Sequence, residues 1–215
     1  MKKIVMDLLF NALRLNPKMK AAPRQTIHHE SFKILEAYRH KSDHPDQMGS
    51  ILDLGGGGEG IIGQVMGRAV TAVDIREDEL MEAPDGPFKV VADARALPFD
   101  GETFYCATAF YFLMYLKSQD LNAVFNEVFR VLKPSGRFII WDVAIPEAKR
   151  ETKRLFVVPL KIDLPNGACN TAYGAPWASR VLNAQQLIRI ATEAGFKLEQ
   201  NLGSDNKIHL VFAKG

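Results

Sequence analysis

A run of glycines is the feature that most limits how this chain can fold. Gly55 to Gly58 follow directly on the short apolar segment Ile51 to Leu54, and a helix-like stretch begins at Ile61. A strand, a tight glycine turn and a helix in this order are typical of the first unit of an open α/β sheet. Glycine there lets the helix pack closely on the strand and lets a ligand approach the backbone. The first and third glycines, with Gly60, also satisfy the spacing G-x-G-x-x-G.

The segments after this loop alternate between strand-like and helix-like patterns, which is typical of βαβ units and a parallel sheet. Gly203 to Asn206 has the composition of a hairpin turn, so one antiparallel strand is expected near the sheet edge. Before the loop, helices are expected over residues 4–15 and 26–39. We predict strands over residues 51–54, 69–74, 88–92, 104–108, 137–143, 196–200 and 208–213, and helices over residues 61–66, 76–82, 121–132 and 183–194.

Length and composition fit one globular domain. The chain has 215 residues, of which 47% are hydrophobic and 24% are charged. We expect one domain over residues 1–215, divided into a helical cap at 1–48, a cofactor-binding core at 49–143, a lid or substrate insertion at 144–180, and a final helix and strand hairpin at 181–215. The insertion follows the fifth strand and is expected to be irregular because breakers recur in it, at Pro146, Pro159, Pro165, Gly167, Gly174 and Pro176.

Charge and cysteine content argue against several classes of protein. A formal net charge of only +2 argues against a nucleic-acid partner. Cys106 and Cys169 are too few for a disulfide framework or a structural zinc site. No apolar run reaches the roughly 18 residues of a membrane span, so no membrane partner is expected. Asp7, Asn11 and Arg14 interrupt the apolar N-terminus, which indicates an amphipathic helix rather than a signal peptide, and a cytoplasmic protein.

Two acidic residues end neighbouring strands of the predicted sheet. Asp74 follows Gly55 by 19 residues and ends the second strand, where a carboxylate can accept hydrogen bonds from the two hydroxyls of a ribose. Asp93 ends the third strand, and the carboxyl ends of the strands line one crevice of an open α/β sheet. The glycine loop by itself fits both dinucleotides and adenosyl cofactors. The second acid favours an adenosyl cofactor, because it could hold an adenine amino group and a dinucleotide site needs no acid there.

With these motifs in this order, the sequence resembles a known family, the class I S-adenosylmethionine-dependent methyltransferases. It looks most similar to their small-molecule branch, methyltransferase type 11. The resemblance covers about Ile51 to Phe196 and implies a doubly wound, seven-stranded, Rossmann-like sheet. It also implies S-adenosylmethionine as the cofactor and methyl transfer of the EC 2.1.1 class. The matching stretches are Ile51-Leu52-Asp53-Leu54-Gly55-Gly56-Gly57, Val73-Asp74-Ile75, Asp93-Ala94, Leu97-Pro98-Phe99, Val131 to Arg137, and Ala194-Gly195-Phe196.

The resemblance implies which residues would hold the methionine part of the cofactor. Asp53 and the backbone of Gly55, Gly56 and Gly57 would surround it, and the Ala109 carbonyl would accept from its ammonium group. The chain departs from the family here, because a polar residue is frequent near positions 109 to 111. The usual Asp-x-Val pattern of the fourth strand is also replaced, by residues 104–106.

The adenosine part would lie against the two acidic strand ends. By the same resemblance, Asp74 would bind the ribose hydroxyls and Ile75 would pack on the adenine face. Asp93 would contact the adenine amino group, and the Ala94 backbone would contact a ring nitrogen.

The chemistry that the resemblance implies places few demands on the protein. Methyl transfer from a sulfonium is a direct displacement, which needs alignment of the acceptor and exclusion of water. A general base is needed only for acceptors that must lose a proton. The candidates for that role are Tyr111, after the fourth strand, and His28, on an N-terminal helix, and no metal is expected. Phe112 and Tyr115 are expected in the core rather than at the site.

Two alternative functions stay open beside methyl transfer to a small-molecule acceptor. One is an NAD(P)-dependent oxidoreductase with a Rossmann fold, against which Asp53 before the loop and Asp93 both argue. The other is a non-catalytic adenosyl-binding protein. The apolar N-terminal helix could serve a homodimer, but the acceptor and its reacting atom are not readable from the sequence.

Overall fold

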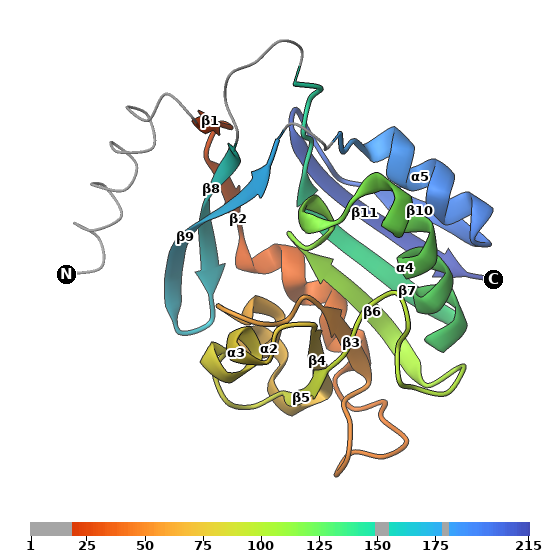
Figure 1. Cartoon of the computed structure of the whole chain (residues 1–215). Coiled ribbons are helices and arrows are strands. Elements are labelled where there is room, and N and C mark those ends of the chain that lie inside the picture. Colours follow the sequence, from red (N-terminus) through yellow and green to blue (C-terminus); the bar gives the residue numbers. More distant parts are fainter. Residues whose placement is uncertain (1–18, 149–154, 178–180) are drawn as a thin grey trace.

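The computed structural model describes residues 19–148, 155–177 and 181–215. One large sheet contains seven strands in the order β10-β11-β7-β6-β3-β4-β5 (Figure 1). Its strands are β3 (Ile51–Leu54), β4 (Val70–Asp74), β5 (Phe88–Val91), β6 (Phe104–Phe110), β7 (Leu132–Val143), β10 (Phe196–Asn201) and β11 (Lys207–Lys214). Strand β11 runs antiparallel to both β7 and β10, and the other pairings are parallel. The predicted mostly parallel α/β sheet with an antiparallel strand near its edge is confirmed.

The short strand β3 lies inside this sheet, between β6 and β4, and is buried along its whole length. It pairs with β4 on one side and β6 on the other, so that Leu54 lies opposite both Val73 and Ala109. A strand buried on both faces needs a continuous apolar run rather than alternation, as the sequence provides here. The register brings the carboxyl ends of β3, β4 and β6 together at one edge of the sheet.

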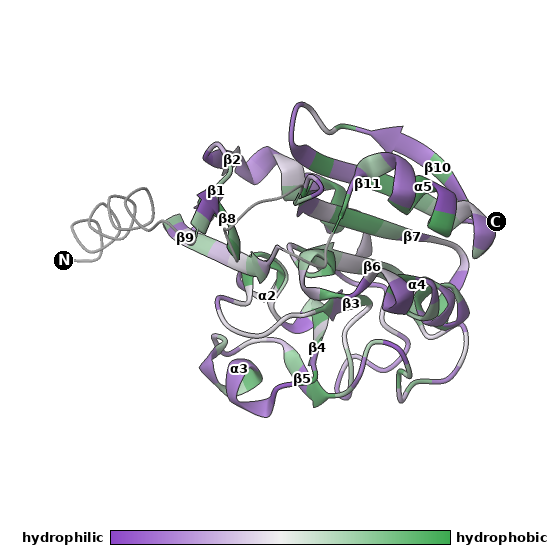
Figure 2. Ribbon diagram, turned by 45° about the horizontal axis from the view of Figure 1, so that its top comes forward, coloured by the Kyte–Doolittle hydropathy of each residue, from purple (hydrophilic) through white to green (hydrophobic). Residues whose placement is uncertain are grey.

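Helices cover the sheet and bury their apolar faces against it. They are α2 (Ile61–Met66), α3 (Glu77–Glu82), α4 (Ser118–Val131) and α5 (Ala184–Glu193), with the 3₁₀ helices η1 (His29–Tyr38), η2 (Gly67–Ala69) and η3 (Leu113–Tyr115). Figure 2 shows hydrophilic and hydrophobic residues mixed along α4 and α5, whereas β7 and β11 are largely hydrophobic. Asn183 caps α5, because its side-chain oxygen accepts from the Gln186 backbone N–H at 2.8 Å.

A second sheet replaces the irregular insertion that the sequence predicted. Strands β8 (Leu155–Leu164) and β9 (Gly167–Pro176) form an antiparallel hairpin, and the short strands β1 (Met19–Ala21) and β2 (Gln25–Ile27) pair with the other edge of β8 (Figure 1). The prolines misled the prediction. Pro159 lacks an N–H, but it lies between the residues of β8 that pair with β1 and those that pair with β2. A strand tolerates proline where no ladder bond is required.

The N-terminal part also differs from the prediction. The expected helix over residues 26–39 is instead β2 followed by η1, and the expected helix over residues 4–15 lies outside the described residues. In η1, Phe32, Leu35 and Tyr38 are buried against the large sheet. Across the described ranges, no helix is both long and apolar enough to cross a membrane.

Candidate functional site

A cavity of about 280 Å³ opens at the carboxyl edge of the large sheet. Its walls come from the loop after β3, from the ends of β4 and β5, and from the segment that connects β6 to α4. Five of the predicted site residues line it: Gly55, Asp74, Ile75, Asp93 and Ala94. The other lining residues are Val73, Ala92, Arg95, Phe112, Tyr115, Leu116, Lys117 and Asp120.

The glycine loop is fixed against its neighbours by backbone hydrogen bonds. The Gly55 and Gly56 N–H groups both donate to the Val73 carbonyl, at 2.8 and 3.1 Å. Gly55 has φ +70°, and a side chain there would also collide with Phe112, whose Cδ2 would lie 2.5 Å from a Cβ. At Gly56 a Cβ would come within 2.8 Å of the Asp53 carboxylate. Glycine is therefore required by the packing of the loop as well as by its conformation.

The end of β4 presents one carboxylate and one apolar side chain to the cavity. The Arg76 backbone N–H donates to Asp74 Oδ1 at 2.9 Å. No other hydrogen bond reaches the Asp74 carboxylate from the residues that the structure describes, so Oδ2 is available to a ligand. Ile75 is 63% exposed, which is unusual for so large an apolar side chain. An acceptor oxygen beside an uncovered apolar surface suits a ligand with hydroxyls and a flat ring.

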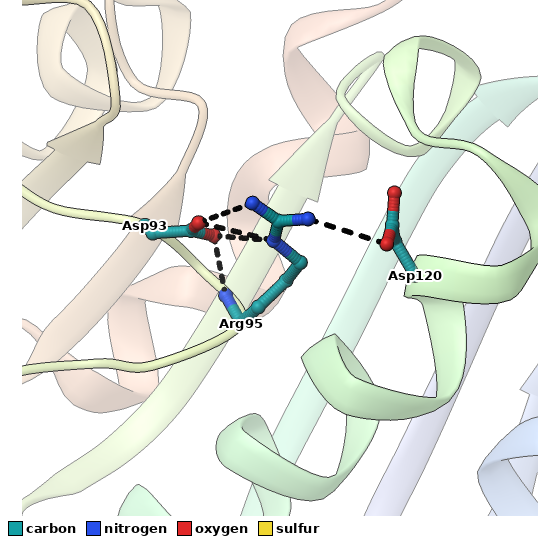
Figure 3. A network of polar contacts seen from close by, with 3 residues as sticks. All are labelled: Asp93, Arg95 and Asp120. Atoms are coloured by element: carbon teal, nitrogen blue, oxygen red, sulfur yellow. Dashed lines mark hydrogen bonds and ion pairs between the residues drawn. The ribbon is translucent and has the colours of Figure 1, made fainter.

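The Asp93 carboxylate is already engaged by a cation. Arg95 donates from Nε to Oδ1 at 3.0 Å and from Nη2 to Oδ2 at 2.6 Å, and its backbone N–H also donates to Oδ1. The same guanidinium reaches across to Asp120 in the first turn of α4, at 3.3 Å (Figure 3). These hydrogen bonds hold the pKa of Asp93 below its usual range and raise that of Arg95. Sequence analysis did not identify Arg95 or Asp120 as part of this site.

Two buried carboxylates lie beneath this edge of the sheet without lining the cavity. Asp53 accepts from Thr108 Oγ1 at 2.7 Å, and Asp142 accepts from the backbone N–H groups of Met114 and Val143. Burial raises the pKa of each to about 7. For Asp53 the nearby negative charge of Asp74 adds to the effect of burial. Asp142 thus fixes η3 to the end of β7, and both carboxylates ionise at a cost.

The predicted base candidates do not line the cavity. Tyr111 is 2% exposed, and its hydroxyl donates to the side-chain oxygen of Gln25. Burial raises the pKa of Tyr111 well above its ordinary value. His28 lies at the start of η1, exposed, with Nδ1 3.0 Å from the Asp163 carboxylate on β8. The Ala109 side chain is fully buried at the end of β6.

Phe112 and Tyr115, by contrast, line the cavity, and their expected place in the core is wrong. They follow the end of β6 in a segment that turns through η3 instead of continuing the strand. Strand ends face the ligand crevice in sheets of this type, so their position after β6 was the available signal.

Comparison with known proteins identifies the class of this fold and site. Residues 52–140 match the family described as methyltransferase domain. The chain is 35% identical over 103 residues to the sterol 4-C-methyltransferase strm-1 of Caenorhabditis elegans, covering 43% of this chain and 30% of that protein. It is 37% identical over 108 residues to the ubiquinone/menaquinone biosynthesis C-methyltransferase UbiE of Desulfotalea psychrophila, covering 46% of this chain and 43% of that protein.

Among solved structures, a SAM-dependent methyltransferase from Methanosarcina mazei superimposes with a TM-score of 0.56 at 18% identity, covering 85% of this chain and 97% of that one. The large sheet thus has the fold of S-adenosylmethionine-dependent methyltransferases. Residues 52–140 of this chain match a methyltransferase domain, as the resemblance implied. The chain spans less than half the length of these two curated relatives.

The residues at the cavity fit the cofactor of this class, S-adenosylmethionine. Asp74 offers an uncommitted carboxylate oxygen and Ile75 an uncovered apolar surface, side by side at the end of β4. The backbone of Ala94 is on the same wall. Asp93 fits less simply, because an adenine amino group would have to share its carboxylate with Arg95.

Proposed function

We propose that this protein transfers a methyl group from S-adenosylmethionine to a small-molecule acceptor by direct displacement, with S-adenosylhomocysteine as the second product. The observation that supports this most strongly is the cavity at the strand ends, where Gly55, Asp74, Ile75, Asp93 and Ala94 come together. One cavity is lined by five residues that come from three separate segments of the sequence and that were all predicted to bind the cofactor. The match of residues 52–140 to the methyltransferase domain agrees with this assignment.

In this proposal Asp74 binds the ribose hydroxyls through its carboxylate, and Ile75 packs against the adenine. Asp93 and the Ala94 backbone bind the adenine edge. Asp53 and the backbone of Gly55 to Gly57 surround the methionine part, with the Ala109 carbonyl accepting from its ammonium group. When bound, S-adenosylmethionine supplies a methyl group on a positively charged sulfur, and that charge is neutralised as the methyl group leaves.

The residues of this chain then have to align the acceptor and exclude water. In reactions of this type, these two effects supply much of the reduction in the activation barrier. Phe112 and Tyr115 supply apolar walls for this purpose. Neither Tyr111 nor His28 lines the cavity, so we assign no general base. We expect an acceptor that reacts without one, or one whose proton is lost before binding.

We further propose that the protein is cytoplasmic and consists of one domain. Residues 1–48 and 144–180 are proposed to select the acceptor. A homodimer is the assembly to test first. Two curated relatives are named as C-methyltransferases, one for a sterol and one for ubiquinone/menaquinone biosynthesis. The regions proposed to hold the acceptor lie mostly outside residues 52–140, which match the methyltransferase domain. Sterol-like and quinone-like carbon acceptors are therefore the first to screen.

Calorimetric titration with S-adenosylhomocysteine, with NADH in parallel, tests the proposal. Micromolar binding of the former and none of the latter is the expected result. The variant Asp74→Ala should weaken the binding by roughly 1–3 kcal/mol, about 5- to 150-fold, because it removes a charge-assisted hydrogen bond. Tight NADH binding without any response to S-adenosylhomocysteine would favour the oxidoreductase instead, and undiminished binding by folded Asp74→Ala would remove Asp74 from the ribose site.

A further inference from the structure

One side chain of the glycine loop does not face the cavity and binds the second sheet instead. Glu59 Oε1 accepts from Thr171 Oγ1 at 2.5 Å, and Oε2 accepts from Tyr173 Oη at 3.0 Å. Both donors lie on β9, two residues apart, and therefore on one face of that strand. A single carboxylate thus holds two hydroxyls of a hairpin that is 112 residues further along the chain.

The local conformation of the loop is suited to this contact. Gly58 and Gly60, on either side of Glu59, have φ of +59° and +53°. Both values lie in the left-handed region that favours glycine, so the chain turns sharply before and after Glu59. The Gly58 N–H also donates to the Glu79 carbonyl at 2.8 Å, which anchors the loop to α3. The loop that borders the cavity and the loop that presents Glu59 are therefore one continuous turn.

Strand β9 makes further contacts around the same corner of the molecule. The rings of Tyr173 and Tyr111 lie 5.8 Å apart, and Tyr111 follows the end of β6. Tyr115, a cavity residue, lies in η3, which contacts β9. Thr171 is buried and Tyr173 is partly buried, so these contacts are shielded from competing water. The hairpin is thus held against both edges of the cavity without lining it.

We propose that Glu59 is a positioning residue, which ties β9 to the cofactor loop and makes the order of β9 depend on occupancy of that loop. The proposal rests on the proposed function, since it needs a ligand that orders the loop. Hydrogen bonds to an ionised carboxylate are stronger than those between neutral groups, so the tie can transmit that order. Coupling of this kind is reciprocal. If binding of S-adenosylhomocysteine orders β9, then an ordered β9 held by Glu59 raises the affinity for S-adenosylhomocysteine by the same factor.

Hydrogen exchange measured by mass spectrometry tests this proposal on peptides that cover residues 167–176, with and without saturating S-adenosylhomocysteine. In the wild type we expect the ligand to slow exchange of β9 severalfold, although no β9 residue lines the cavity. In Glu59→Ala that slowing should disappear, and calorimetry should show about fivefold weaker binding of S-adenosylhomocysteine. Glu59→Gln should retain part of both effects, because its oxygen can accept from Thr171 and its NH₂ can donate to Tyr173 Oη, but the charge that strengthens the contacts is lost.

Two further variants separate this role from a general loss of stability. Tyr173→Phe removes one of the two donors, keeps the ring, and should show an intermediate effect even if Glu59→Ala does not fold. Glu36→Ala removes a carboxylate that is paired with Arg39, away from β9, and should leave the response of β9 unchanged. A merely structural Glu59 would speed exchange equally with and without ligand.

The outcomes distinguish the two levels of the proposal. If S-adenosylhomocysteine binds the wild type but leaves β9 exchange unchanged, or if Glu59→Ala and Tyr173→Phe both keep the ligand-dependent slowing, the role of Glu59 is refuted and the proposed function stands. If calorimetry detects no binding to the wild type, the proposed function fails and the role of Glu59 fails with it.

Discussion

Replacing Asp53 with asparagine should stabilise the ligand-free protein at neutral and alkaline pH. The Asp53 carboxylate is buried beneath the glycine loop, and its one hydrogen bond from another side chain comes from Thr108 Oγ1 at 2.7 Å, among the residues that the structure describes. An asparagine oxygen can accept that bond equally well. The substitution keeps the shape of the side chain, replaces one carboxylate oxygen by an NH₂ group, and removes a charge that no cation balances in the described structure.

The size and the sign of the effect follow from the pKa. Burial raises the pKa of Asp53 from 3.8 to about 7. The folded protein therefore holds a proton between these two pH values that the unfolded chain has lost, and stability falls as the pH rises through that window. A difference of about three pH units is worth about 4 kcal/mol at the rate of roughly 1.4 kcal/mol per unit. Asp53→Asn should escape that loss, so its advantage grows from near zero at pH 4 to about 4 kcal/mol above pH 7.

Urea unfolding of the wild type and of Asp53→Asn, at a series of pH values from 4 to 9, measures this difference directly. Asp100→Asn is the matched control, because it makes the same substitution at an exposed position. Parallel stability curves for the wild type and Asp53→Asn would refute the reasoning, since they would mean that the buried carboxylate costs nothing to ionise. If Asp53 also serves the methionine part of the cofactor, the stabilised variant should bind S-adenosylhomocysteine more weakly.

Three other substitutions give independent tests. Gly57→Ala places a Cβ 2.6 Å from the Cβ of Glu79 and should destabilise the fold by about 1–3 kcal/mol, seen as a lower Tm. Asn183→Ala removes the cap of α5 and should cost about 1 kcal/mol, or a Tm lower by about 2–4 °C; an unchanged Tm would mean that water replaces the cap. Arg95→Ala should free the Asp93 carboxylate for a ligand and tighten S-adenosylhomocysteine binding by up to about fivefold, whereas weaker binding in calorimetry would show that Arg95 itself supports the ligand.

Local sequence patterns were sufficient to predict which strands and helices follow one another along the chain in the large sheet. The apolar run of β3, the glycines after it, the acid that ends β4 and the acid two residues beyond β5 are all features of a few consecutive residues. The expected topology then predicted where these residues lie, because parallel strands bring their carboxyl ends to one edge of the sheet. For that reason Asp74 and Asp93 could be placed in one crevice without a structure.

The same reasoning failed where the secondary structure depends on strand pairing rather than on local composition. Proline and glycine predicted an irregular segment over residues 144–180, yet β8 and β9 pair along their whole length. Pro159 lies where β8 has no ladder partner on the side of β1 and β2, and that position is defined only once those strands are in place. Propensity describes a residue, whereas a ladder bond depends on a second segment far along the chain.

The sequence by itself therefore determined the sheet, the glycine loop and the acidic strand ends, since these depend on periodicity and turn chemistry within a few residues. Only the tertiary structure decided which charges meet. It joined the local pair of Asp93 and Arg95 to Asp120, it left Asp53 buried with no cation beside it among the described residues, and it brought Glu59 to β9. The physical reason is that the cost of a buried charge and the strength of a hydrogen bond depend on neighbours that folding supplies from distant parts of the chain.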